Sequence, residues 1–151
     1  LQARGGHDLG EADAVLLGSP IYLGRVSGEM AAFLDRFLFQ YSVYSNPPQS
    51  LFPRKISSGF IYTMNATEEQ AKEMGYDRGI AFQEGMMRRI FGNTESLLSF
   101  DTYQFEDYSK VVSSRFDPEK KAKRREEVFP EDCRKAFAMG VRFAKQAMAG
   151  I

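Results

Sequence analysis

Tryptophan is absent from this 151-residue chain, cysteine occurs once, and the charges cancel. The lone cysteine, Cys133, excludes an internal disulfide framework and a four-cysteine metal site made by this chain alone, and we predict no metal ligands. Twenty Lys and Arg against twenty Asp and Glu argue against nucleic-acid binding, which needs a basic surface to displace counterions. No apolar run approaches the roughly 20 residues of a membrane-spanning helix, and the first residues lack the regions of a signal peptide. We therefore expect a cytoplasmic protein that binds neither nucleic acid nor membranes.

The remaining composition is typical of a folded domain. Hydrophobic residues make up 43% and charged residues 26%, and the length suffices for a sizeable core. Aromatic residues are numerous, with 13 Phe and 7 Tyr, and five of these rings follow closely on one another: Phe37, Phe39, Tyr41, Tyr44 and Phe52. One helix face and its loop cannot readily bury that many rings, and contiguous exposed apolar area usually marks an interface. The cluster predicts a homodimer or homotetramer.

Short apolar segments alternate with helical patterns along the chain. Strands are predicted at 13–18, 55–64 and 95–100, and the continuous apolar run of the first predicts a strand buried on both faces. Four helical regions are also predicted. The first is capped by Ser27 and has an apolar stripe from Met30 to Tyr41, and the second runs to Phe91 with an interruption at 75–79. A charged helix begins at Asp117-Pro118, and a final helix begins at Pro130. This order predicts a three-layer α/β protein with a parallel sheet.

Two features of the last helices are interpreted as structural. The final helix is expected to bury a stripe, and this places Cys133 in the core rather than in redox chemistry: Cys133, Phe137, Val141, Ala144 and Met148. The basic run before it is flanked by glutamates and predicts a solvated helix face: Lys120, Lys121, Lys123, Arg124 and Arg125.

Ligands of such sheets bind at the carboxyl ends of the strands, where three predicted loops meet, at 19–27, 63–67 and 101–105. The loop from Ser19 to Gly28 combines small residues, exposed backbone N–H groups, the ring of Tyr22 and a following helix N-terminus. Such a surface suits a planar ligand that is anionic or partly polar. A tight strand-to-helix turn containing a proline is an equally good interpretation of this loop taken alone.

The fuller string is more specific. Residues 12–36 read ADAVLLGSPIYLGRVSGEMAAFLDR, which closely resembles the third-strand segment of the NADPH-dependent FMN reductase and iron–sulfur flavoprotein group of flavodoxin-like proteins. Thr63-Met64-Asn65 and the segment from Asp101 to Phe105 are similar to the same group. The resemblance implies an FMN cofactor and NAD(P)H as reductant.

The resemblance also implies site residues. Pro20, Tyr22 and Gly24 would line the flavin ring, with backbone contacts from Ser19 and Ile21. Leu23 belongs to the same candidate cofactor-binding set. The set is completed by Thr63, Met64 and Asn65 after the second strand and by Tyr103 after the third. Tyr103 and Phe105 could instead pack an interface. No catalytic residue is expected, because the cofactor carries the hydride chemistry.

The resemblance implies a flavodoxin-like three-layer sandwich in which strands 3-4-5 and their helices are visible and strands 1-2 are missing. Residues 1–151 would then form the C-terminal two-thirds of a single flavodoxin-like FMN-binding domain. In the sheet order 2-1-3-4-5, the strand at Ala14 should pair with the first strand and would otherwise be an open edge. We expect either that the sequence starts within the domain or that another segment fills this gap.

Three functions are compatible with these residues. The first is an FMN-dependent NAD(P)H oxidoreductase that passes hydride or electrons to a quinone, a flavin or another small acceptor. The alternatives are an electron-transfer flavoprotein between protein partners and a non-redox flavodoxin-like interaction module. Shuttle flavodoxins are commonly strongly acidic because charge steers docking, so the balanced charge favours the enzyme.

Overall fold

The computed structural model describes residues 6–112, 114 and 116–150. The chain alternates strands and helices in this order: α1 (Gly6–Glu11), β1 (Ala14–Tyr22), β2 (Arg25–Val26), α2 (Gly28–Phe39), β3 (Ser42–Val43), β4 (Gln49–Ser50), β5 (Ser57–Thr63), α3 (Glu68–Glu73), α4 (Tyr76–Phe91), β6 (Thr94–Ser99), the 3₁₀ turn η1 (Tyr108–Lys110), α5 (Pro118–Glu127) and α6 (Phe129–Met148). The three predicted strands and four predicted helical regions are confirmed. α1 and the short strands β2, β3 and β4 were not predicted.

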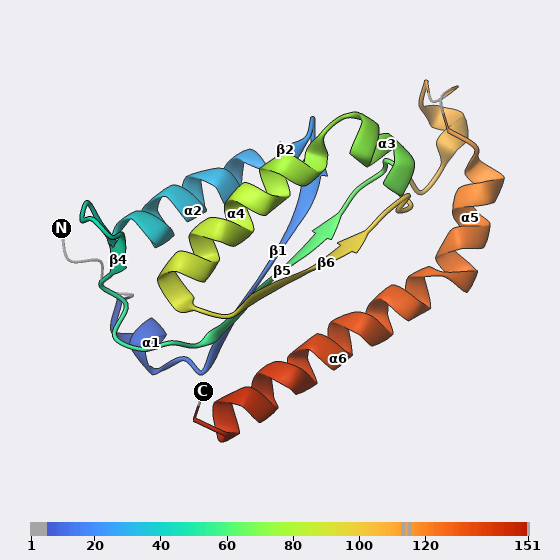
Figure 1. Cartoon of the computed structure of the whole chain (residues 1–151). Coiled ribbons are helices and arrows are strands. Elements are labelled where there is room, and N and C mark those ends of the chain that lie inside the picture. The colour runs from blue at the N-terminus through green and yellow to red at the C-terminus, as the bar shows by residue number, and fades with distance from the viewer. Residues whose placement is uncertain (1–5, 113, 115, 151) are drawn as a thin grey trace.

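The sheet has the order β2-β1-β5-β6 and is mostly parallel. β5 runs parallel to β1 from Ser57 beside Ala14, and parallel to β6 from Ser58 beside Thr94. Helices α2 and α4 cover one face of the sheet and α6 covers the other, which gives three layers (Figure 1). The fold is therefore α/β with a mostly parallel sheet, consistent with the flavodoxin-like class. The assignment of residues 1–151 to the later two-thirds of such a domain stays a prediction.

Local signals set the helix ends where the sequence places them. The Ser27 hydroxyl caps α2 by accepting a hydrogen bond from Met30 N at 3.2 Å. Thr67 and Gln70 form a reciprocal capping box at α3. Gly75, with φ at 71°, then interrupts the helical stretch, and α4 begins one residue later. The predicted interruption at 75–79 is therefore confirmed at Gly75, whereas 76–79 already belong to α4.

Burial on both faces characterises β5 rather than β1. Ser57 to Phe60 and Tyr62 are all buried in β5, whereas Leu16 of β1 is 46% exposed. The prediction of double-sided burial for β1 is therefore wrong on its α6 side. The small residues of β5 have a packing reason, because a Cβ on Gly59 would lie 2.9 Å from the Phe143 ring of α6.

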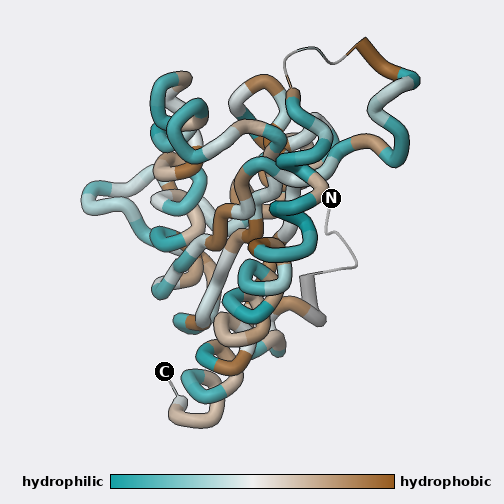
Figure 2. The backbone as a smooth tube through the Cα atoms, turned by 90° about the vertical axis from the view of Figure 1, so that its right-hand side faces the viewer, coloured by the Kyte–Doolittle hydropathy of each residue, from teal (hydrophilic) through white to brown (hydrophobic). Residues whose placement is uncertain are grey.

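Helix α6 packs on the sheet with a different stripe from the predicted one. Asp132, Met139 and Phe143 are buried, whereas the predicted stripe faces outward: Cys133 is exposed, Phe137 is 76% exposed and Met148 is 88% exposed. Figure 2 shows hydrophobic stretches among hydrophilic ones on this helix, which faces the viewer and ends at the C-terminus. The core assignment of Cys133 is therefore wrong, because the sheet contacts the neighbouring face of the helix.

The aromatic cluster is largely satisfied within the chain. Phe52 is 6% exposed and packs edge-on against Phe91 at 4.9 Å and against Tyr41 at 5.1 Å between ring centroids. Phe37 lies 5.6 Å from the same Phe91 ring. Tyr41 lies 6.3 Å from it as well, so Phe91 of α4 contacts three of the five rings. The sequence argument for an interface therefore rests on the remaining two, Phe39 and Tyr44.

Among the described residues, no helix combines the length and apolarity that a membrane crossing requires. The cytoplasmic location stays a prediction.

Candidate functional site

The first wall of the candidate site is the end of β1. This strand runs to Tyr22, so the predicted loop at 19–27 is in fact a strand end followed by a hairpin to β2, with Ile21 paired to Val26. Leu23 and Gly24, the two hairpin residues, have φ values of 51° and 82°, as in the type I′ turns that connect antiparallel strands. The turn leaves Tyr22 57% exposed and Leu23 96% exposed at the carboxyl edge of the sheet.

Two predicted residues stabilise this hairpin rather than line a cavity. The buried Ser19 hydroxyl donates to Pro20 O at 2.9 Å and accepts from Ser27 N at 3.1 Å. Gly24 lies so close to α4 that a Cβ there would approach the Tyr76 ring at 2.9 Å. Ser19 and Gly24 therefore hold the hairpin in place but do not line the cavity.

The second wall consists of the segments that follow β5 and β6. Asp101 N donates to Ala66 O at 2.8 Å, and Thr102 N donates to Met64 O at 2.9 Å. The Thr102 hydroxyl also donates to Met64 O, at 3.1 Å. These hydrogen bonds join the two segments into one rim.

The two walls enclose a cavity of about 210 Å³ at the carboxyl edge of the sheet. It brings together seven of the ten predicted cofactor-binding residues and two residues that sequence reasoning missed: Pro20, Ile21, Tyr22, Thr63, Met64, Asn65 and Tyr103, with Thr102 and Gln104. A neighbouring cavity of about 320 Å³ shares Tyr22 and Asn65, adds Leu23, and extends to Tyr76 of α4 and to Phe116. The carboxyl-edge placement expected from strand order explains why three distant segments meet here.

Among the residues that the structure describes, neither cavity is lined by a charged side chain. It does carry an unused acceptor, because Asn65 Oδ1 is buried and has no hydrogen-bond partner among the described residues. A buried polar atom of this kind is costly unless a ligand completes its hydrogen bonding. The flavin ring system is planar and has a ring N–H donor, so these residues fit the ring part of FMN, and they include no cation for its phosphate.

Tyr103 is held by its own loop. Its ring packs edge-on against the buried Tyr108 at 5.1 Å, and the Phe105 ring does so at 5.3 Å. Tyr108 OH accepts a hydrogen bond from Gln104 N at 3.0 Å. The Arg125 guanidinium lies 5.3 Å from the centre of the Tyr103 ring. Tyr103 thus reaches the cavity from an internally packed aromatic cluster.

A buried polar network supports the rim from the α6 side. Asp132 Oδ2 accepts from the Ser99 hydroxyl at 2.7 Å and from Arg124 at 2.8 Å. The hydroxyl of Tyr62 in β5 donates a hydrogen bond to Gln83 of α4 at 3.0 Å. Burial is the larger cause that raises the pKa of Tyr62, and the nearby Glu84 carboxylate is the smaller one. Tyr62 is therefore a neutral core residue.

Fold and site together define an α/β protein, consistent with the flavodoxin-like class, with a cavity at the carboxyl edge of its sheet whose described lining residues are uncharged. Residues 5–71 match the model of the family described as NADPH-dependent FMN reductase, and the resemblance inferred from the sequence is confirmed over that segment. FMN is the cofactor and NADPH the reductant of this oxidoreductase family. The match includes the whole β1 wall and Thr63 to Asn65, whereas Tyr103 and Gln104 lie outside it. A search of the curated proteins found no match.

Proposed function

We propose that this protein is an FMN-dependent NAD(P)H oxidoreductase that passes hydride or electrons to a quinone, a flavin or another small acceptor. The observation that carries the proposal is the convergence of Pro20, Tyr22, Thr63 and Asn65 on one uncharged cavity. The family match over residues 5–71 supports the same reaction class.

The roles of the residues follow from their geometry. FMN, when bound, supplies the hydride transfer. Pro20 and Tyr22 would offer apolar surface to the planar ring, and Asn65 Oδ1, which has no partner among the described residues, would accept a hydrogen bond from a ring N–H. The hydroxyl of Thr63 lies on the same rim. Because Tyr22 is 57% exposed, the site is open to a diffusing substrate.

An absorbance spectrum of the purified full-length protein tests the proposal. We expect a yellow protein that NADPH bleaches. A flavin bleached only by a reduced protein partner would instead indicate the electron-transfer alternative, and a colourless protein that FMN cannot reconstitute would refute both.

Asn65→Ala and Asn93→Ala form a matched pair for the site. Asn65 Oδ1 is buried at the cavity, whereas Asn93 is exposed just before β6, at the opposite end of the strand. Loss of a hydrogen bond to the bound ring should raise the FMN dissociation constant about tenfold for Asn65→Ala. Asn93→Ala should bind as the unchanged protein does. Equal affinities for the two variants would remove Asn65 from the site.

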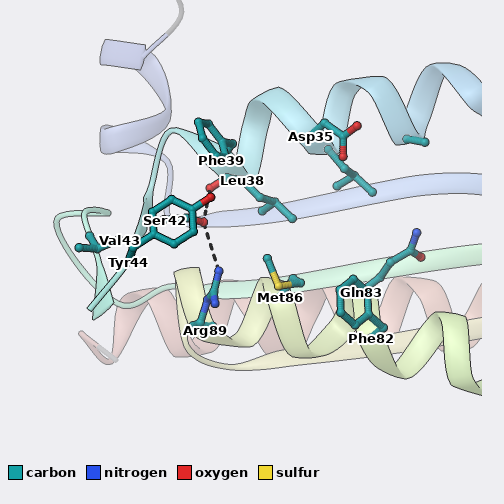
Figure 3. A pocket seen from close by; sticks show the side chains of 12 residues that line it. Asp35, Leu38, Phe39, Ser42, Val43, Tyr44, Phe82, Gln83, Met86 and Arg89 are labelled. Atoms are coloured by element: carbon teal, nitrogen blue, oxygen red, sulfur yellow. Dashed lines mark hydrogen bonds between the residues drawn. The ribbon is translucent and has the colours of Figure 1, made fainter. Parts of the chain in front are cut away.

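We also propose that the protein is a homodimer formed through a groove between α2 and α4. The groove has a volume of about 330 Å³ and is bounded at one end by β3 (Figure 3). Three exposed rings rim it, Phe39 at 64%, Tyr44 at 94% and Phe82 at 72% exposed. Exposed apolar area of this kind on a folded domain typically marks an interface.

Charge supports a second copy of this chain as the occupant of the groove. Asp35 lies on the α2 wall and Arg89 on the α4 wall, where Arg89 Nε is buried without a partner among the described residues. A two-fold axis across the groove would bring each Asp35 toward the Arg89 of the other copy. The zero net charge adds no long-range repulsion between copies.

Light scattering after size exclusion tests the dimer. We expect the unchanged protein to be dimeric and Phe82→Ser to be monomeric. Phe137→Ser, at the 76% exposed ring on α6, is the control and should stay dimeric. A monomeric unchanged protein refutes the proposal.

A further inference from the structure

One charged side chain behind the candidate site is almost completely buried. Lys121 is 2% exposed, although it belongs to the most hydrophilic helix of the chain, α5. Its neighbour Lys123 has a side chain that is 71% exposed. The sequence interpretation of a solvated basic face is therefore wrong for Lys121 and for Arg124, whose side chain is 15% exposed. Burying an ammonium group costs several kcal/mol unless its hydrogen bonds are completed.

The Lys121 ammonium group completes its hydrogen bonds on the rim of the candidate site. It pairs with Asp101 Oδ1 and donates to Asn65 O at 3.2 Å and to Thr102 O at 3.5 Å. The Phe116 ring covers it at 5.2 Å. Three acceptors match the three hydrogens of the group, and they come from both segments that form the second wall.

This arrangement fixes the backbone on which the cavity depends. Asp101 has a φ of 49°, a left-handed conformation that is uncommon for non-glycine residues. The backbone carbonyl of Asn65 accepts a hydrogen bond from Lys121, while its side-chain oxygen is buried and has no partner within the described part of the chain. The same residue therefore connects the buried charge to the atom that fits the flavin ring.

We propose that Lys121 is the positioning residue of the flavin site. Its ammonium group holds the segments after β5 and β6 in one relative arrangement, so that Asn65 and the rim from Thr102 to Gln104 are preorganised for the ring. Lys121 does not line the cavities at Tyr22 and acts through Asn65 and Asp101. This inference rests on the proposed function, because it assumes that the flavin ring binds in this cavity.

A pair of variants separates positioning from stability. Lys121→Met leaves the Asp101 carboxylate without its partner and should destabilise the protein. The double variant Lys121→Met/Asp101→Asn removes both charges together, and asparagine tolerates the left-handed backbone, so it should recover most of the lost stability. Lys123→Met is the control on the exposed side of the same helix.

The readouts are the dissociation constants for FMN and for lumiflavin, which has the ring but no phosphate, measured by flavin fluorescence. The free energy of unfolding is measured on flavin-free protein. We expect the double variant to bind both ligands about tenfold more weakly although its stability is recovered, because the residues that contact the ring lose the side chain that holds them in place. The visible circular dichroism of its bound flavin should also change. Lys123→Met should behave as the unchanged protein.

The outcomes distinguish the two proposals. If the double variant binds lumiflavin as tightly as the unchanged protein, Lys121 serves stability alone and the positioning role is refuted. Weaker binding of FMN with unchanged binding of lumiflavin refutes it as well, because the proposed role concerns the ring. Asp101→Asn keeps an acceptor for Lys121 but leaves its buried charge without a counter-charge, so it should destabilise the protein and weaken lumiflavin binding severalfold. If the unchanged protein binds neither ligand, the proposed function itself fails.

Discussion

Replacing Leu23 by asparagine should stabilise the protein, because Leu23 occupies an unfavourable backbone conformation and makes little contact. Its φ is 51° and its side chain is 96% exposed. A left-handed conformation costs an ordinary L-residue roughly 1–2 kcal/mol, and asparagine adopts it more readily. Since almost no apolar burial is lost, the expected gain is about 1 kcal/mol in the free energy of unfolding. For a domain of this size, the melting temperature should rise by about 2–4 °C.

Leu23→Ala separates the backbone effect from the effect of removing an exposed apolar side chain. Alanine keeps the steric cost of a Cβ at positive φ, so its stability should stay within about 0.5 kcal/mol of the unchanged protein. Urea denaturation followed by circular dichroism measures both variants. If the asparagine variant is no more stable than the alanine variant, the strain assigned to this turn is refuted.

The same variants test why a leucine occupies the turn. Leu23 lines the larger of the two site cavities, and strained residues concentrate where function requires them. If Leu23 contacts the flavin, Leu23→Asn should gain stability and lose FMN affinity together. A gain in stability with unchanged FMN affinity would remove Leu23 from the site.

Three other changes should alter stability in defined directions. Gly24→Ala combines a φ of 82° with a 2.9 Å approach to an α4 ring and should cost about 2–4 kcal/mol in urea unfolding, whereas Gly28→Ala meets nothing within 4 Å and should cost almost nothing. Burial raises the pKa of Tyr62 above its ordinary 10.0. The contribution of Tyr62 to the free energy of unfolding is therefore complete below pH 10 and is lost as the pH rises above that value. Tyr62→Phe should flatten this fall when the free energy of unfolding is measured over a pH series. In Asp132→Ala the mostly buried Arg124 loses its carboxylate partner, so the free energy of unfolding should fall by about 3 kcal/mol, as measured by thermal melting. The fall should be smaller for Asp132→Asn.

The sequence was sufficient to locate the main elements but not to orient the last helix. Phe137 and Phe143 both recur at helical spacing with other apolar residues, so periodicity alone gives two candidate faces for α6. The choice depends on Gly59 in a distant strand, where the missing side chain admits the Phe143 ring. Such three-dimensional complementarity leaves no periodic signal in the helix itself.

The site shows a similar division. Pro20 and Asn65 were predictable because both lie near the carboxyl end of a recognisable strand, within a specific motif. Gln104 reaches the cavity through an irregular loop whose shape depends on the hydrogen bond from Gln104 N to the Tyr108 hydroxyl. Lys121 was hidden within a run of charged residues, and only the acceptors of two other segments distinguish it from its exposed neighbours.

The unequal pairing of β1 has a consequence for amide exchange with solvent. Within the described part of the chain, its edge away from β5 is paired only at Ile21 and Tyr22, whereas β5 is paired on both sides. The amides between Ala14 and Pro20 that point away from β5 should therefore exchange with deuterium within seconds to minutes, whereas the amides of β5 should exchange only through global unfolding. Slow exchange at those outward amides would reveal another strand on this edge.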